Sequence, residues 1–281
     1  MTDNMKQYKR KTLNILPDSV NKVLNMENSK LLSKRFGEEI LKDFLIVNLS
    51  HLYFYYYNSE SVLDCGWGCA WRSMQTLLKF QQSISGQNKD KEITFYNLFT
   101  NFGSKNFLLD TYKKMKNKNI EILQKTNFAP HENDSGWAEP FISQLISYHF
   151  GFEGELILIN DYPPKSYAPK EVFDITINFN EFVSFLNEHF SKKNAGPIII
   201  DDATSSICII GIKYDNESQI MQLLIMDPHC VEKPEDGLYI IILDGEGNQL
   251  GTIPDEVKLA SMSIFFNQKN WMVFIPHIID K

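Results

Sequence analysis

The sequence predicts an α+β fold in which helices come early in the chain and strands come late. Apolar residues at helical spacing dominate up to residue 190, and a Gly-Pro pair at 196–197 is followed by short apolar or alternating runs. Turn residues separate most of these runs, at 215–216, 235–237 and 245–248. We therefore expect a mostly antiparallel sheet packed against the preceding helices.

The composition limits the classes of partner. The chain has 281 residues, 43% of them hydrophobic, and a net charge of −7, which argues against nucleic acid and anionic membrane surfaces as partners. No apolar run approaches the roughly 18 residues that a membrane span needs, and residues 1–6 lack the apolar core of a secretory signal. Four cysteines are too few for a disulfide scaffold of this size. A monomeric protein of the cytoplasm is expected.

The first elements follow in order. Residues 1–45 are predicted to form an N-terminal arm or helical extension, polar and only partly ordered up to residue 35, with a helix over 36–47. The apolar stripe expected on that helix is Ile40, Leu41, Phe44 and Leu45. Residues 52–57 are rich in tyrosine and predict an extended segment. Residues 46–281 show no internal repeat or clean linker, so one domain is expected there.

A glycine-rich turn then leads into a helix at Cys69. Residues 63–77 read Leu-Asp-Cys-Gly-Trp-Gly-Cys-Ala-Trp-Arg-Ser-Met-Gln-Thr-Leu, and helical spacing starts at Ala70 and continues to about Gln82. A thiol at a helix N-terminus is favoured as thiolate by the dipole and the unpaired N–H groups. This pattern suits a cysteine nucleophile, and a buried structural cysteine at a tight turn fits the spacing equally well.

The rest of the chain supplies the sheet and two further helices. Residues 83–135 are polar, and their basic run at 113–118 is expected to be a solvated face. Helices are predicted over 140–150, where proline suits the first turn, and over 179–190. A proline-rich loop is expected over 160–170. The predicted strands are 156–159, 198–200, 207–214, 220–226, 238–243 and 271–275.

A cysteine nucleophile needs a base, and His229 is the preferred histidine of six. It follows the apolar strand 220–226 as part of Asp227-Pro228-His229. Residues i and i+2 of an extended chain share a face, so Asp227 and His229 would both face Cys69. A neighbouring Asp fixes the tautomer of a histidine and stabilises its imidazolium. An ordinary turn after a strand is the competing interpretation.

Together the two stretches resemble the ubiquitin-fold-modifier-specific proteases (UFSP), which are papain-like cysteine proteases. The family block Gly-Trp-Gly-Cys-(Ala/Gly)-Tyr-Arg-(Ser/Thr)-Leu-Gln-Thr differs here mainly by Trp71 for Tyr and Met74 for Leu. The autophagins, proteases of autophagy, share Gly-Trp-Gly-Cys and Asp-Pro-His but fit the block less well. The resemblance extends over residues 46–281, predicted as a papain-like protease domain, and implies Cys69 as nucleophile with the Asp227–His229 pair.

The resemblance also implies roles around the nucleophile. The family has a tyrosine twelve residues before its cysteine, here Tyr57, whose hydroxyl would bind the oxyanion together with the N–H of Cys69. Spacing alone does not exclude Tyr53, Tyr55 or Tyr56. The residues expected to wall a narrow channel for a glycine-ended tail are Gly66, Trp67 and Gly68. Core packing is an equal alternative for the tryptophan.

The chain departs from the family at Asp201-Asp202-Ala203, where the family keeps a glycine run. We expect Asp201 and Asp202 to line the approach to Cys69 and to favour a basic or neutral partner surface. A solvent-exposed turn that does not reach the site is the alternative.

The function implied by the resemblance is cleavage after the C-terminal glycine of a ubiquitin-fold modifier, in precursor maturation or deconjugation. The partners would be the modifier and its conjugates, and no cofactor is implied. Two alternatives stay open: an autophagin-like protease of a lipid-linked modifier, and a modifier-binding pseudo-protease. A zinc site is disfavoured because only Cys65 and Cys69 are closely spaced, while Cys208 and Cys230 lack a knuckle pattern.

Overall fold

The computed structural model describes residues 23–26, 30–116, 120–133, 136–163, 165–231, 233–255 and 270–277. Residues 1–22 and 27–29, which make up most of the predicted N-terminal arm, lie outside this part. The described helices are α2 (Leu31–Phe36), α3 (Glu38–Leu41), α4 (Cys69–Ser85), α5 (Phe95–Phe102), α6 (Lys105–Lys116), α7 (Glu121–Gln124), α8 (Pro140–His149) and α9 (Phe179–Phe190). Short 3₁₀ turns are η1 (Leu49–His51), η2 (Ser59–Ser61), η3 (Lys170–Val172) and η4 (Pro234–Gly237).

The described strands form one large sheet and a small ribbon. They are β1 (Leu24–Asn25), β2 (Leu45–Ile46), β3 (Tyr53–Phe54), β4 (Gly154–Ile159), β5 (Ile175–Ile177), β6 (Ile198–Asp201), β7 (Ser206–Asp215), β8 (Ile220–Met226), β9 (Leu238–Leu243), β10 (Gln249–Ile253) and β11 (Trp271–Pro276). The large sheet has the order β10-β9-β8-β7-β6-β11-β4-β5, with β2 also paired to β7, and β1 pairs with β3 separately. Only the β4–β5 pair of these described strands is parallel.

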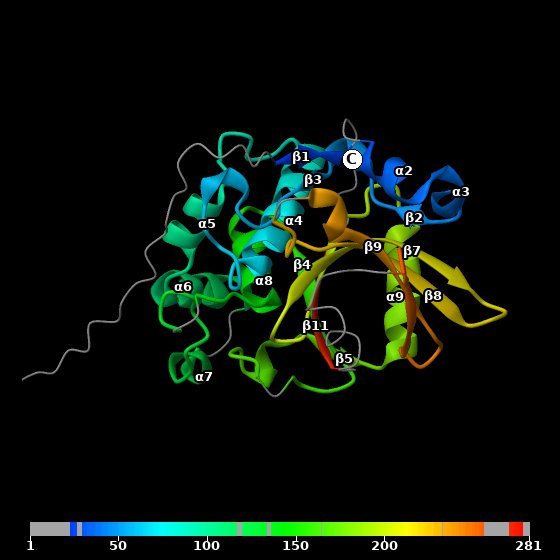
Figure 1. Ribbon diagram of the computed structural model, residues 1–281. Helices are drawn as coiled ribbons and strands as arrows, with labels where there is room; N and C mark the ends of the chain where they lie inside the picture. The colour runs from blue at the N-terminus through cyan, green and yellow to red at the C-terminus, as the bar shows by residue number, and fades with distance from the viewer. Residues whose placement is uncertain are drawn as a thin grey trace, which may run out of the picture.

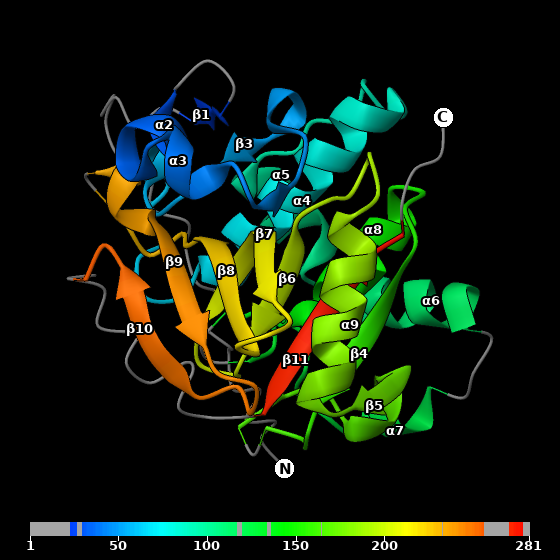
Figure 2. The same ribbon diagram turned by 90° about the vertical axis from the view of Figure 1, so that its right-hand side faces the viewer.

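Helices cover both faces of the sheet (Figures 1 and 2). α4 and α8 lie on one face, where α4 contacts β6 and β7 and α8 contacts β4 and β11. α9 lies on the other face, against β7. Strands β6 and β11 are buried at every residue, which explains why their sequences are continuous apolar runs rather than alternating ones.

Helix α4 is the central helix on its face of the sheet. Almost every side chain in it is buried, including polar ones such as Arg72 and Gln75, because α5 and α8 cover the side that the sheet does not. It ends where Gly86 takes the left-handed conformation, with φ of 66°. A helix this deeply enclosed holds its first residue, Cys69, in a fixed position.

The predicted α+β fold is confirmed: a helix that begins at Cys69 packs against a mostly antiparallel sheet. The predicted helices over 140–150 and 179–190 correspond to α8 and α9. The predicted strands correspond to β4, β6, β7, β8, β9 and β11. Among the helices that the structure describes, none has the length and apolar character needed to cross a membrane.

The helix predicted over residues 36–47 is wrong. Gly37, with φ of 78°, ends α2 at Phe36, α3 lasts a single turn, and Leu45 is 42% exposed on β2. Phe44 is buried as expected. The division of the chain at residue 45 stays a prediction.

The sequence analysis also missed helices within the polar segment 83–135. Helix α5 has a capping residue, Thr94, whose hydroxyl accepts from the N–H of Asn97 at 3.2 Å. Its buried stripe, Phe95, Leu98 and Phe99, follows helical spacing. The high polar content of the whole segment concealed this local signal. Strands β5 and β10 were likewise missed.

Candidate active site

A tight turn over residues 64–68 delivers Cys69 to the start of α4. The N–H groups of Trp67 and Gly68 donate to the carbonyl oxygen of Asp64 at 3.2 and 2.8 Å. Gly66 has φ of +81°, a conformation that favours glycine, and a Cβ on Gly68 would lie 2.4 Å from Asp64 Oδ2. Both glycines are therefore required by the turn itself. The Cys69 side chain at its end is 6% exposed.

The Asp227–His229 pair follows directly on the end of β8. Asp227 Oδ1 accepts a hydrogen bond from His229 Nδ1 and a second from the backbone N–H of His229 at 2.9 Å. An ionised carboxylate only accepts, so Nδ1 carries the proton and Nε2 is left to interact with the Cys69 side chain. Asp227 is 1% exposed, and its Oδ2 accepts from the hydroxyl of Tyr239 at 2.7 Å.

Tyr57 is the tyrosine that the structure brings to this group. Its hydroxyl interacts with the Cys69 side chain, and its ring lies edge-on to His229 with centroids 5.2 Å apart. Its backbone N–H donates to the carbonyl oxygen of Pro228 at 2.9 Å. The other three tyrosines lie elsewhere: Tyr53 under Lys79, Tyr55 near Glu60, and Tyr56 against Phe54.

The electrostatics favour the charged form of His229. Burial disfavours this form, but the Asp227 carboxylate and then the Cys69 side chain outweigh burial and raise the pKa of His229 to about 11. These contacts therefore stabilise His229 as an imidazolium. Burial and then the charge of Cys69 raise the pKa of Tyr57 well above its ordinary value, so its hydroxyl stays a donor.

The other five histidines are engaged away from Cys69. Their contacts are His51 with Ser83, His131 and His189 with the backbone oxygens of Phe99 and Gly196, His149 with the Phe102 and Phe107 rings, and His277 with Glu153. His229 is thus the histidine that these contacts leave for the thiol.

A buried charge network behind the turn was missed by the sequence analysis. Arg72 is fully buried and donates from Nε to Asp64 Oδ2 at 2.7 Å and from Nη1 to Glu60 Oε2 at 2.9 Å. It also donates to the Ser59 carbonyl oxygen at 2.7 Å and to Gln75. Arginine within the apolar start of a helix was the available signal, since it has to find acceptors there.

The predicted channel residues lie in different surroundings. Trp67 is 9% exposed and packs edge-on against Phe95 and Phe99, with ring centroids 5.4 and 5.3 Å from its own. This is the core-packing role that the sequence left as the alternative to a channel wall. Gly66 is exposed on the turn, and Gly68 is buried against Asp64. A wall role for these residues stays a prediction.

Asp201 and Asp202 are buried at 3% and 2% exposure, so the solvent-exposed turn is wrong. Asp202 Oδ1 accepts from the N–H and hydroxyl of Thr204 and from the Ser205 N–H, which shapes the β6–β7 turn. Burial, and then the charges of Glu139 and Cys69, raise the pKa of Asp201 well above its ordinary value. Asp201 is thus close enough to sense Cys69, whereas its influence on substrates stays a prediction.

All four cysteines are free, and only Cys65 is exposed. Its Sγ donates to Asn58 Oδ1 at 3.4 Å. Cys208 and Cys230 are buried in the core. Within the described ranges, no group of three or more His, Cys, Asp and Glu side chains is arranged to hold a metal ion.

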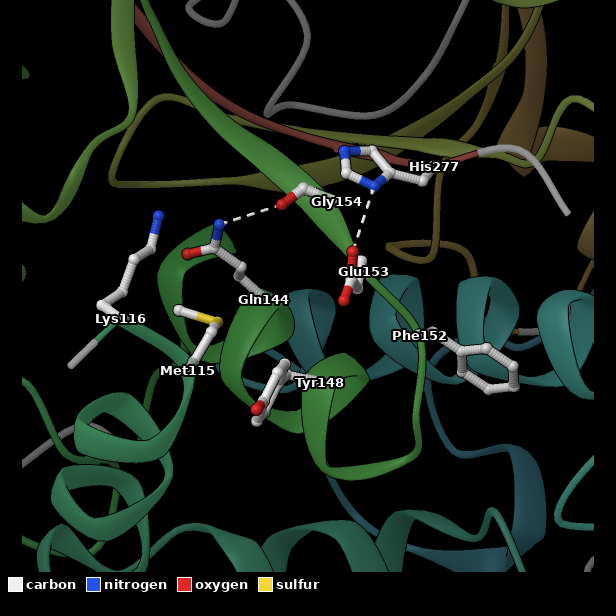
Figure 3. Close-up of a pocket in the computed structure, with 8 residues that line it drawn as sticks. All are labelled: Met115, Lys116, Gln144, Tyr148, Phe152, Glu153, Gly154 and His277. Carbon is white, nitrogen blue, oxygen red and sulfur yellow. Dashed lines mark hydrogen bonds and ion pairs between the residues drawn. The ribbon is translucent and has the colours of Figure 1, made fainter.

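A cavity of about 190 Å³ lies between α6, α8 and the start of β4 (Figure 3). It is lined by Met115, Lys116, Gln144, Tyr148, Phe152, Glu153, Gly154 and His277. None of the residues grouped around Cys69 lines it, so it plays no part in the candidate chemistry.

A comparison with known protein families covers the segment that carries Asp-Pro-His. The model of peptidase family C78 matches residues 168–241, which include Asp227, His229 and Tyr239. Among solved structures, the crystal structure of UfSP from C. elegans is similar at 16% identity and a TM-score of 0.47. The match covers 84% of this chain, which spans about a third (34%) of that protein. Among curated proteins, none matches. The family match agrees with the resemblance predicted from the sequence: over residues 168–241 this chain is similar to peptidase family C78.

Proposed function

We propose that this protein is a thiol protease that cleaves after the C-terminal glycine of a ubiquitin-fold modifier. The observation that carries the proposal is the convergence on one thiol of a helix N-terminus, an Asp-oriented histidine and a buried tyrosine hydroxyl. These are the nucleophile, base and oxyanion donor that acyl transfer through cysteine requires. The C78 match supports a cysteine peptidase, and the family resemblance supports the modifier as substrate.

The steps follow from the contacts. His229 holds the proton of Cys69 as imidazolium, and the thiolate attacks the carbonyl carbon of the terminal glycine. The Tyr57 hydroxyl and the Cys69 N–H, which has no partner inside the helix, stabilise the oxyanion. His229 returns the proton to the leaving amine, which departs and leaves a thioester. His229 then takes a proton from water, whose oxygen attacks the thioester and releases the glycine carboxylate and the thiol.

The test uses modifiers that carry an electrophile at the C-terminal glycine, with the mass of the adduct as readout. We expect one adduct with the wild-type protein and with Cys65→Ala, and none with Cys69→Ala. Folding of each protein is checked by circular dichroism. An adduct on Cys69→Ala would refute the nucleophile. Reaction only with modifiers of the autophagin class would refute the substrate, and tight binding of the modifier without an adduct would indicate a pseudo-protease.

A further inference from the structure

The carboxylate of Asp227 has two oxygens with separate tasks. Oδ1 accepts from both the ring and the backbone N–H of His229. Oδ2 accepts from the hydroxyl of Tyr239 at 2.7 Å and from no other group in the described part of the chain. We propose that Tyr239 is a positioning residue of the site: its hydroxyl locks the Asp227 carboxylate in the rotamer that orients His229 toward Cys69. This inference rests on the proposed function.

Tyr239 is built into the fold at a rigid place. It is 1% exposed on β9, where it pairs with Ile225 of β8, two residues before Asp227. Burial and then the neighbouring Asp227 charge raise its pKa well above the ordinary value, so it remains protonated and can only donate to the carboxylate. The donor therefore comes from the paired strand and not from the Asp-Pro-His segment itself.

The same strand start also holds the backbone of Asp227. The N–H of Asp227 donates to the Gly237 carbonyl oxygen at 2.7 Å. A Cβ on Gly237 would lie 2.4 Å from the carbonyl oxygen of Asp227, so glycine permits this close approach. The backbone of Asp227 is thus held by Gly237, and its side chain is held by Tyr239. Of these two contacts, only the one with Tyr239 acts on the rotation of the carboxylate.

Loss of the hydroxyl would act on His229 through Asp227. A buried carboxylate oxygen without a donor is costly, so the group would rotate toward other donors and orient Nδ1 less firmly. The imidazolium would then be less stabilised, and the thiolate of Cys69 would form only at higher pH. Burial raises the pKa of Tyr57, Cys208 and Cys230, so these three groups stay neutral and do not shape this transition. Burial also raises the pKa of Asp201, which senses the charge of Cys69, but Asp201 is present in both proteins and acts on both profiles alike.

The experiment compares wild type with Tyr239→Phe by the rate of Cys69 alkylation with iodoacetamide from acid to alkaline pH, read by peptide mass. This probe needs no modifier. We expect the rise of the alkylation rate to move up by about one pH unit, a roughly tenfold loss near neutral pH. At alkaline pH, where thiolate forms without the imidazolium, the two rates should converge. With the modifier substrate, kcat should fall by about tenfold with KM unchanged.

Two controls separate positioning from general support of the fold. Tyr112→Phe removes the hydroxyl of another buried tyrosine, which packs against Phe141 on α8, and should leave the alkylation profile unchanged. In an Asp227→Asn background, Tyr239→Phe should change the rate less than about twofold, because the residue through which it acts is already altered.

Three results would overturn the inference. One is an alkylation profile of Tyr239→Phe equal to that of wild type. Another is a change of rate that persists at alkaline pH. The third is loss of folding in Tyr239→Phe while Tyr112→Phe folds, which would show that the Tyr239 hydroxyl stabilises the fold in general. Absence of turnover in every protein, with the alkylation shift present, would refute the proposed function and leave the inference intact.

Discussion

Arg72 is the residue whose loss should most damage the support of Cys69. Its guanidinium is fully buried and donates to the Asp64 and Glu60 carboxylates at 2.7 and 2.9 Å and to the Ser59 carbonyl oxygen at 2.7 Å. Arg72→Met keeps an apolar stem against the Phe95 ring but leaves Asp64 as a buried charge without its cation. Removing one partner of such a pair costs about 3–5 kcal/mol of the free energy of unfolding.

Urea unfolding measures this loss from the shift of the midpoint at constant slope. The matched control is Lys213→Met, which removes a cation 3.0 Å from Asp43 where both side chains are substantially exposed. A surface pair of this kind contributes about 0–1 kcal/mol. If Arg72→Met loses no more stability than Lys213→Met, the network does not support the turn and the argument fails.

The loss should also depend on pH with a definite sign. Burial raises the pKa of Asp64 and Arg72 opposes it. Without Arg72 the pKa of folded Asp64 rises further, so the folded variant binds a proton that the unfolded chain releases at the same pH. Its stability relative to wild type therefore recovers as the pH falls from about 8 to about 5. A deficit that grows on acidification would contradict this account.

Three further predictions concern the surroundings of the site and the core. Asp227→Asn should lower kcat by about 10⁴-fold, the loss that the equivalent change causes in trypsin, and a loss below tenfold in single turnovers would contradict this. Gly68→Ala should cost about 1–3 kcal/mol in urea unfolding because its Cβ meets Asp64 at 2.4 Å, and unchanged stability would show the turn can yield. Burial lowers the pKa of His189 to about 4, and the unfolded chain binds this proton more readily. His189 alone should therefore contribute a loss of about 3 kcal/mol between about pH 7 and pH 4, and His189→Gln should lose less stability than wild type over this range.

Cys69, Asp227 and His229 of the candidate site could be predicted from the sequence because each follows a short, strong local signal. The two glycines just before Cys69 predict a turn that leads into a helix. The apolar strand followed by Asp227 and His229 predicts a histidine base paired with a carboxylate. Tyr57 could not be identified from the sequence alone, because spacing left four tyrosines as candidates. Only its contacts with Cys69 and His229 distinguish it from the other three.

The supporting residues were not predictable because their partners are distant in the chain or differ in kind. Tyr239 reaches Asp227 because β9 pairs with β8 in a particular register, and no local sequence pattern predicts that register. In the sequence, Arg72 is one residue of a motif. Its supporting role follows only from its four hydrogen-bond acceptors, which the structure brings together. The burial of Asp202 was missed for a different reason: two charges on a turn suggest exposure, but donors of the same turn satisfy one carboxylate oxygen of Asp202.

The two halves of the site are held by different parts of the fold, and Tyr57 joins them. Arg72 and Asp64 support the turn before Cys69, while β9 supports the segment that ends in His229. The Tyr57 N–H donates to Pro228 in the second half, and its hydroxyl reaches Cys69 in the first. Tyr57 therefore contacts both halves of the site. A change that loosens either support should weaken the thiolate–imidazolium pair before it unfolds the protein, because the pair needs both groups in place whereas the core does not.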